Sequence, residues 1–78
     1  MKAQIESTTK LVTLVVNGHE VSARIWEGHT ENGVACHFFI TRVAVSNDLD
    51  QSQFAAELQE HRLPSRAVER AYDARLIL

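Results

Sequence analysis

The dipeptide Asn17-Gly18 constrains the fold of this 78-residue chain more than any other feature. It separates residues 10–16, which are rich in β-branched side chains, from residues 20–26, in which apolar and polar side chains alternate. Asn-Gly is the favoured pair for a two-residue type I′ turn, because both turn positions need a positive φ. Strict alternation is typical of a strand with one buried face. The sequence therefore predicts a β-hairpin over residues 10–26.

A second Asn-Gly pair, Asn32-Gly33, precedes a third apolar segment, residues 34–45. A two-residue turn here would place Ile25 opposite Ile40 and Trp26 opposite Phe39. We therefore expect a three-stranded antiparallel meander in which the glycines lie between the strands. The third strand would lie at an edge of the sheet, where strands without proline and with few charges tend to pair with another chain.

Two short helices are predicted after the sheet. Asp50 is a suitable N-cap for a helix that starts near Gln51, and Leu49 and Phe54 occupy the two positions of a hydrophobic staple. Phe54 is expected in the core. Pro64 ends this helix, because proline lacks a backbone N–H group and restricts the residue before it.

Ser65 can cap the second helix, and residues 75–78 (RLIL) are expected to finish it rather than to form a fourth strand. The order βββαα predicts an α+β fold: a three-stranded antiparallel β-meander with both C-terminal helices packed on one face, in a single domain that spans residues 1–78.

The assumed register divides the side chains of the sheet between two faces. The face expected beneath the helices is nearly all apolar: Val12, Leu14, Val16, Val21, Ala23, Ile25, Cys36, Phe38 and Ile40. The opposite face places Trp26 beside Phe39, with Arg24 nearby. An open apolar face is typical of an interaction site, and Trp and Arg are common hot spots of binding. A partner surface, a homodimer contact and a cross-strand pair that only stabilises the sheet would each explain it.

Arg62, Arg66 and Arg70 recur every four residues, which predicts that they line one edge of the second helix. Such an edge can meet phosphates or the carboxylates of a protein partner. The alternative is a solvated helix face, on which Glu69 and Asp73 partly neutralise the positive charge of the arginines. The net charge of −2 does not favour nucleic acid as the partner.

No residue pattern points to catalysis, a metal or a cofactor. Cys36 and His37 are adjacent on a predicted strand, so they point to opposite faces and cannot act together; Cys36 is expected in the core. The four histidines match no zinc-binding spacing, and no glycine-rich phosphate loop is present. We therefore expect a protein that is not an enzyme.

The expected location of the protein in the cell follows from its apolar runs, its first residues and its cysteine content. No apolar run exceeds three residues, so no membrane span is predicted, and the first ten residues lack the apolar centre of a signal peptide. The single cysteine excludes an internal disulfide. We expect a cytoplasmic protein.

The layout resembles that of some small anti-CRISPR proteins of phages and mobile elements. In these proteins a hairpin like Asn17-Gly18 with Val21-x-Ala23-Arg24-Ile25 leads into a short sheet, and two helices follow, separated by a break like Leu63-Pro64. The resemblance covers the order of elements and few residues. It implies a protein that binds a subunit of a CRISPR–Cas complex in the host cytoplasm and blocks target-DNA binding or nuclease recruitment.

The leading hypothesis is therefore a non-catalytic protein-binding module, an inhibitor of the anti-CRISPR kind. Its expected partner-binding residues are Trp26, Phe39, Arg24, Arg62, Arg66 and Arg70. The alternatives are a nucleic-acid-binding regulator that uses the arginine-lined helix, and a structural subunit that forms a homodimer through the third strand.

Overall fold

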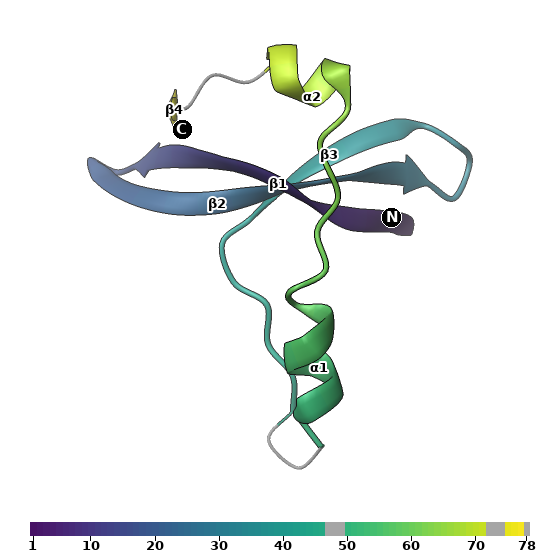
Figure 1. Ribbon diagram of the computed structural model, residues 1–78. Coiled ribbons are helices and arrows are strands. Elements are labelled where there is room, and N and C mark those ends of the chain that lie inside the picture. Colours follow the sequence, from purple (N-terminus) through teal and green to yellow (C-terminus); the bar gives the residue numbers. More distant parts are fainter. Residues whose placement is uncertain (47–49, 72–74, 78) are drawn as a thin grey trace.

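A computed structural model describes residues 1–46, 50–71 and 75–77 (Figure 1). Its elements are β1 (Ala3–Val16), β2 (His19–Thr30), β3 (Ala35–Ile40), α1 (Ser52–Glu57), α2 (Arg66–Ala71) and β4 (Arg75–Ile77). The strand order in the sheet is β3-β2-β1-β4. The predicted three-stranded antiparallel sheet followed by two short helices is confirmed, as is a small α+β fold.

The C-terminal residues depart from the prediction. Strand β4 adds to the outer edge of β1 in parallel, along Thr13–Val15. The expectation that this segment finishes the second helix is therefore wrong for residues 75–77. The outer edge of a strand carries backbone groups that need hydrogen-bond partners, and a short apolar segment can supply them by adding to the sheet.

The first hairpin forms as predicted. Asn17 and Gly18 have φ values of 50° and 80°, and Val16 pairs with His19 across the turn. Strands β1 and β2 extend well beyond residues 10–26 at the end away from the turn. These two long strands form most of the sheet.

The second turn differs from the prediction. Gly33 has a φ of 84°, but Asn17 is the only described non-glycine residue with a positive φ, so Asn32 does not adopt the type I′ geometry. The N–H of Gly33 donates to the carbonyl of Thr30 at 2.9 Å, and that of Thr30 donates to the carbonyl of Val34 at 2.9 Å. The loop therefore has three residues, the next most common hairpin length, with glycine in the left-handed conformation.

The longer loop shifts the register of β3 by one residue. Ile25 pairs with Phe39, and Trp26 pairs with Phe38. A one-residue shift turns every side chain of a strand to the other face. The predicted pair of Trp26 and Phe39 is therefore wrong, and Cys36, expected in the core, is half-buried on the face of Trp26.

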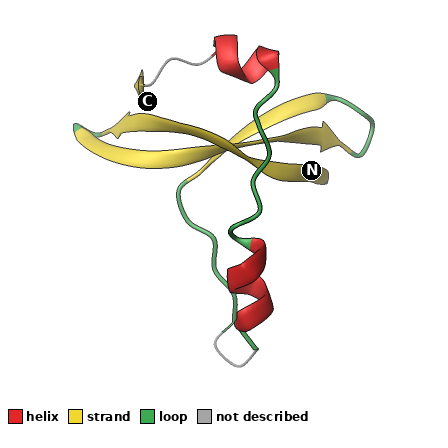
Figure 2. Cartoon of the chain, in the orientation of Figure 1, coloured by secondary structure: helices red, strands yellow, loops and turns green. Residues whose placement is uncertain are grey.

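The core lies between α2 and one face of the sheet. Its buried residues are Val12, Leu14, Ala23, Ile25 and Val68. Figures 1 and 2 place α2 and α1 on opposite sides of the sheet. The expectation that both helices pack on one face is therefore not met.

The chain passes from one side of the sheet to the other beside an irregular part of β1. The pairing of β1 with β2 shifts between Ser7 and Leu11, as in a β-bulge. The segment between the helices pairs with this bulge: the N–H of Thr9 donates to the carbonyl of Arg62 at 2.9 Å, and the N–H of Arg62 donates to the carbonyl of Ser7 at 3.1 Å. This pairing explains why the two helices lie on different sides.

We predicted that all glycines lie between the strands, but one glycine lies inside β2. Gly28 pairs with Ile5 of β1. A Cβ atom at Gly28 would collide with the backbone of Gln4 and would lie 2.7 Å from the Cα atom of Ile5. The close approach of the two backbones therefore requires glycine at this position.

Helix α1 begins close to the predicted position, but its N-cap is Gln51, which makes no side-chain cap hydrogen bond, so the prediction that Asp50 is the N-cap is wrong. The Oδ1 atom of Asp50 accepts hydrogen bonds from the N–H and the hydroxyl of Ser52, both at 2.9 Å, and these bonds lower the pKa of Asp50. Leu49, the other member of the predicted staple, lies outside the described residues. Phe54 is half-buried rather than part of the core, and no residue of α1 is buried. The prediction of a core role for Phe54 is therefore wrong.

Candidate functional site

A pocket of about 440 Å³ lies between α1 and the sheet, on the side opposite the core. It combines apolar and polar side chains from four parts of the chain. The apolar residues that line it are Trp26, Val43, Phe54 and Leu58. The polar and charged ones are Ser7, Arg24, Thr41, Arg42, Glu57, Gln59 and His61.

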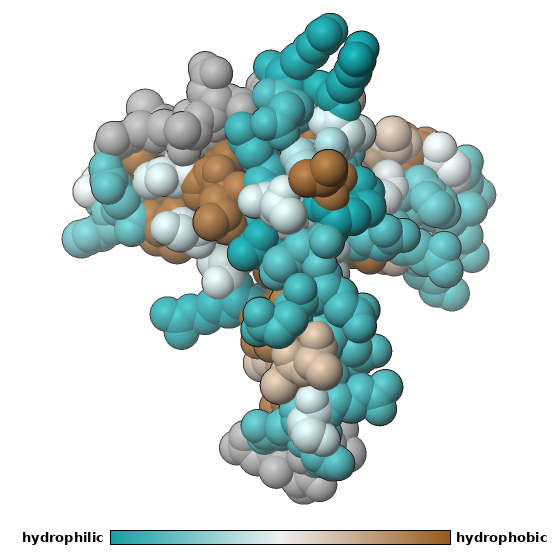
Figure 3. Space-filling model, viewed as in Figure 1, coloured by the Kyte–Doolittle hydropathy of each residue, from teal (hydrophilic) through white to brown (hydrophobic). Residues whose placement is uncertain are grey.

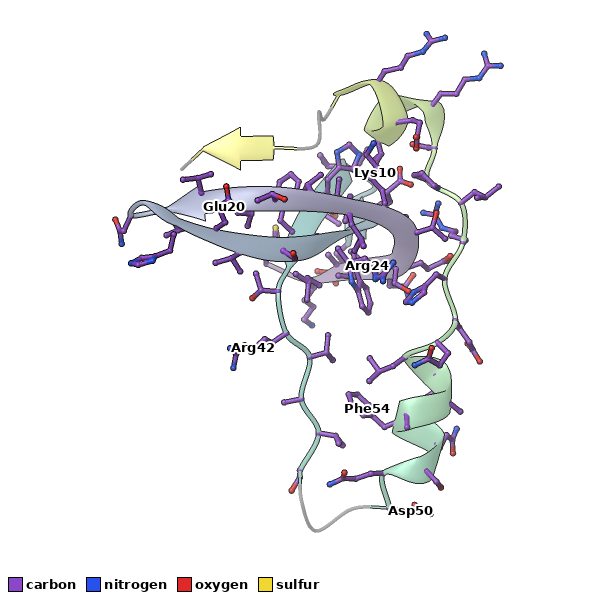
Figure 4. All side chains as sticks on the ribbon, turned by 60° about the vertical axis from the view of Figure 1, so that its left-hand side comes forward. Lys10, Glu20, Arg24, Arg42, Asp50 and Phe54 are labelled. Carbon is purple, nitrogen blue, oxygen red and sulfur yellow. The ribbon has the colours of Figure 1, made fainter. Side chains whose placement is uncertain are left out.

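The alternation of β2 explains how the sheet contributes to this pocket. Arg24 and Trp26 are two residues apart on a strand, so they share a face, while Ile25 between them points into the core. After β3 ends at Ile40, the chain leaves the sheet without regular structure and reaches α1. In Figure 4 the ring of Phe54 points from α1 toward this outgoing segment. The helix therefore lines that side of the pocket.

Arg24 is held in place at the pocket. Its Nη1 atom donates to the carbonyl oxygen of Thr8, in the bulge of β1, at 2.9 Å. Thr8 itself is fully buried, and its hydroxyl donates to the carbonyl of Ile25 at 2.7 Å. The bulge therefore fixes the guanidinium beside the pocket. This contact occupies one of the five N–H donors of an arginine.

The pocket is more basic than the protein around it. Two arginines, one glutamate and one histidine line it, in a chain whose net charge is −2. In Figure 4 the side chain of Arg42 extends away from α1, whereas Arg24 lies on the sheet, two residues before Trp26 on β2. Figure 3 shows that the surface of the part of the molecule that carries α1 is mostly hydrophilic.

Ser7 and His61 form a pair that resembles a nucleophile and its base. The Oγ atom of Ser7 lies 2.9 Å from Nδ1 of His61. The same hydroxyl donates to the carbonyl of Glu60 at 2.7 Å. Because a serine hydroxyl has a single hydrogen, Nδ1 of His61 has to donate when that hydrogen goes to Glu60, and it then cannot take the proton. These contacts connect Glu60 and His61, which follow α1, to β1 of the sheet.

Glu27 is the one carboxylate buried among the described residues, and it lies on the core side of the sheet. Its Oε2 atom accepts hydrogen bonds from the backbone N–H of Ser65 at 2.8 Å and from Nη1 of Arg62 at 3.0 Å. The hydroxyl of Ser65 donates to Oε1. Burial raises the pKa of Glu27, but the bonds from Ser65 and Arg62 outweigh it and hold the pKa below its ordinary value.

The Glu27 cluster is an anchor for the segment between the helices. Arg62 also donates through Nε to Glu6 at 3.0 Å, so the guanidinium bridges two carboxylates of the sheet. Sequence reasoning missed this cluster because the predicted second strand ends at residue 26, one residue before Glu27. A carboxylate in a strand of alternating residues, on the face of Ala23 and Ile25, is the signal that could have revealed it.

The six residues predicted to bind a partner do not form one surface. Arg24 and Trp26 share the pocket, as their spacing predicted. Phe39 lies on the core side with Ile25, because of the register shift. Arg62 lies four residues before α2 and is held by glutamates, so its predicted place on the helix edge is wrong. Arg66 and Arg70 lie on α2, where both are exposed.

Metal-binding clusters and membrane-spanning helices are absent from residues 1–46, 50–71 and 75–77. No three His, Cys, Asp or Glu side chains of these residues gather closely enough to hold a metal ion. Neither of the helices, each of six residues, has the length and apolar character needed to cross a membrane. No protein-family model, curated protein or solved structure matches the chain.

Proposed function

We propose that this chain is a non-catalytic protein-binding module that contacts its partner through the α1 side of the sheet. One observation carries the proposal: Trp26 and Arg24, two residues apart on the same face of β2, both line one pocket. Tryptophan and arginine are the residues most enriched among binding hot spots. Trp26 is half-buried, so part of its ring area is still available to be covered by another protein.

The surroundings of Trp26 support this proposal. Phe38 and Ile40 share its face of the sheet and are half-buried, and Leu11 on the same face is 55% exposed. Because α1 buries none of its own residues, it covers this face far less completely than α2 covers the core. An apolar face of this kind marks an interaction site more often than an unoccupied surface.

The resemblance of layout makes a subunit of a CRISPR–Cas complex the first partner class to test. Under this proposal a phage or mobile element encodes the protein, which acts stoichiometrically in the host cytoplasm without a cofactor. By occupying its partner it blocks target-DNA binding or the recruitment of a nuclease. The small size and the order of elements support this proposal.

A titration of purified CRISPR–Cas complexes of several types, with target-DNA binding as the readout, tests the proposal. We expect inhibition that saturates at an equimolar ratio with one type. Trp26→Ala should weaken binding to that complex by about 2 kcal/mol or more, roughly 30-fold, with a modest dependence on salt. The variant should remain folded, because Trp26 lies on the face opposite the core.

A matched control uses exposed arginines on the other side of the sheet. Arg66→Gln with Arg70→Gln removes two charges from α2 and should leave binding unchanged. A nucleic-acid-binding regulator would behave in the opposite way: adding Arg62→Gln to this pair would abolish binding to DNA or RNA, and affinity would fall steeply with salt. A folded Trp26→Ala variant with full activity would refute the proposed surface.

A homodimer remains a second proposal, because β3 is an edge of the sheet. Its six residues include no proline, lysine, arginine or acidic residue, which are the usual devices that prevent edge-to-edge pairing. Sedimentation of the protein at high concentration distinguishes the two proposals. A monomer throughout would argue against the dimer and leave the partner-binding surface in place.

A further inference from the structure

Resting on the proposed function, we infer that the pocket between α1 and Trp26 receives one large apolar side chain of the partner, next to one carboxylate of the same segment. The occupant is therefore an acidic protein segment with an apolar anchor. The pocket volume of about 440 Å³ falls within the range of sites that bury a ligand, roughly 300–1,000 Å³.

The apolar wall provides the place for the anchor. Trp26 and Phe54 face the pocket from the sheet and from α1, and both are half-buried. Val43 and Leu58 complete the wall and are 43% and 36% exposed. An inserted side chain would remove the remaining apolar area of these residues from water, which is the main source of favourable free energy for such contacts.

Charge complementarity identifies the second feature of the occupant. The bond from Arg24 to the carbonyl of Thr8 fixes its guanidinium at the pocket before any partner arrives, and further N–H donors of the same group can bind a carboxylate oxygen. A fixed donor loses little side-chain entropy on binding. Because Arg24 is two residues from Trp26 on one strand, an anchor on the ring brings the neighbouring residue of the partner within reach of the guanidinium.

The same pocket argues against a nucleic acid. Glu57 lines it from α1, and Glu60 lies three residues further along the chain, after the helix has ended. A nucleic acid carries a phosphate at every nucleotide and depends on several cations for affinity. A pocket that is lined by one fixed guanidinium and also by a glutamate suits a single carboxylate better than a row of phosphates.

Trp26 is the only tryptophan of the chain, so its fluorescence reports directly on the pocket. The probes are three capped tetrapeptides that differ in their two central residues: phenylalanine–aspartate, alanine–aspartate and phenylalanine–lysine. A short oligothymidylate is the fourth probe. We expect saturable binding of the first peptide, with an apparent Kd at least tenfold lower than those of the other three probes.

Variants of Arg24 separate charge recognition from folding. Arg24→Gln should abolish the preference for aspartate over lysine, whereas Arg24→Lys, which keeps the charge, should retain it. Arg70→Gln makes the same charge change on α2 and should leave all affinities unchanged. Circular dichroism confirms that each variant is folded.

Four outcomes would overturn the inference: equal binding of the three peptides, a preference for lysine, tighter binding of the oligonucleotide, or no binding of any of the four probes. The proposed function has a separate outcome, since Trp26→Ala would still weaken inhibition of the intact complex. If the peptides fail and that variant is defective, the occupant is wrong and the binding surface stands.

Discussion

The two helices have the same length and make very different contributions to the fold. Helix α2 places Val68 in the core, where its side chain is fully buried against the sheet. Helix α1 buries none of its residues, and its largest apolar side chain, Phe54, is half-buried at the pocket. The comparison indicates that the α2 side of the sheet contributes the core, while the α1 side, where we propose that a partner binds, contributes none of its helix residues to it.

Strand β2 contains the same division within a single run of residues. Ala23, Ile25 and Glu27 are buried on the α2 side, and Arg24 and Trp26 lie between them on the α1 side. Because neighbours on a strand point to opposite faces, a substitution on one side has little direct effect on the other. Stability and binding can therefore be tested separately with adjacent residues.

The largest expected effect is on the core side. Val68→Ala removes apolar volume from a fully buried position and should lower the free energy of unfolding by about 2.5 kcal/mol, from lost burial plus a cavity. Phe54→Ala removes a larger side chain, but from a half-buried position, and should cost only about 1 kcal/mol, against about 3–5 for a phenylalanine in a core. Urea unfolding of both variants measures the difference. The slope of the unfolding free energy with urea concentration should be the same for both, because it reflects the area exposed on unfolding.

The ranking of the two variants is the decisive result. A cost for Phe54→Ala equal to or above that of Val68→Ala would mean that α1 is packed as tightly as α2. The proposed division of the two sides would then be wrong. If Val68→Ala does not fold while Phe54→Ala does, the ranking is the expected one.

The next effect concerns the anchor that ties the segment before α2 to the sheet. Glu27→Gln keeps the size of the side chain but removes the charge that accepts bonds from Arg62 and Ser65. We expect a loss of about 1–2 kcal/mol at neutral pH, the range for hydrogen bonds to a charged group in a partly exposed cluster. Urea unfolding at a fixed salt concentration measures it.

The pH dependence of this loss follows from the lowered pKa of Glu27. A carboxyl whose pKa is lower in the folded state than in the unfolded state, where it is about 4.3, stabilises the protein above that value. The stabilisation is lost as the pH falls through the folded pKa. The difference between the wild type and Glu27→Gln should therefore shrink below about pH 4. Asp50 titrates in both proteins, so its contribution cancels, and a difference that stays constant into acid would contradict the anchor.

The sequence was sufficient to predict the parts that depend on local chemistry. The first hairpin was predictable because Asn17 and Gly18 both tolerate a positive φ, and the approximate start of α1 because polar turn residues precede it. The placement of Trp26 and Arg24 on one face followed from alternation along β2. These inferences required no knowledge of residues far away in the chain.

The parts that failed depend on distant contacts or on a choice between similar local geometries. Asn32-Gly33 is compatible with loops of two and three residues, and the longer loop sends Phe39 to the core side. The position of α1 depends on the pairing of Arg62 with the bulge at Ser7, residues that are far apart in the sequence. For the same reason the pocket could not be assembled from the sequence, although two of its central residues were identified.

The smallest expected effect is confined to α1. Asp50→Ala removes the carboxylate that accepts bonds from Ser52, and its main consequence should be more frequent opening of this one helix. Hydrogen exchange should become faster at the amides of Ala55 and Leu58, which bond within α1, and remain unchanged at Glu69, whose amide bonds to Ser65 at the start of α2. The midpoint of global unfolding should stay nearly the same, because α1 contributes no residue to the core. Faster exchange at Glu69 as well, or a clearly lower midpoint, would show that α1 and the core unfold as one unit. The proposed binding side and the stabilising side could then no longer be treated as independent.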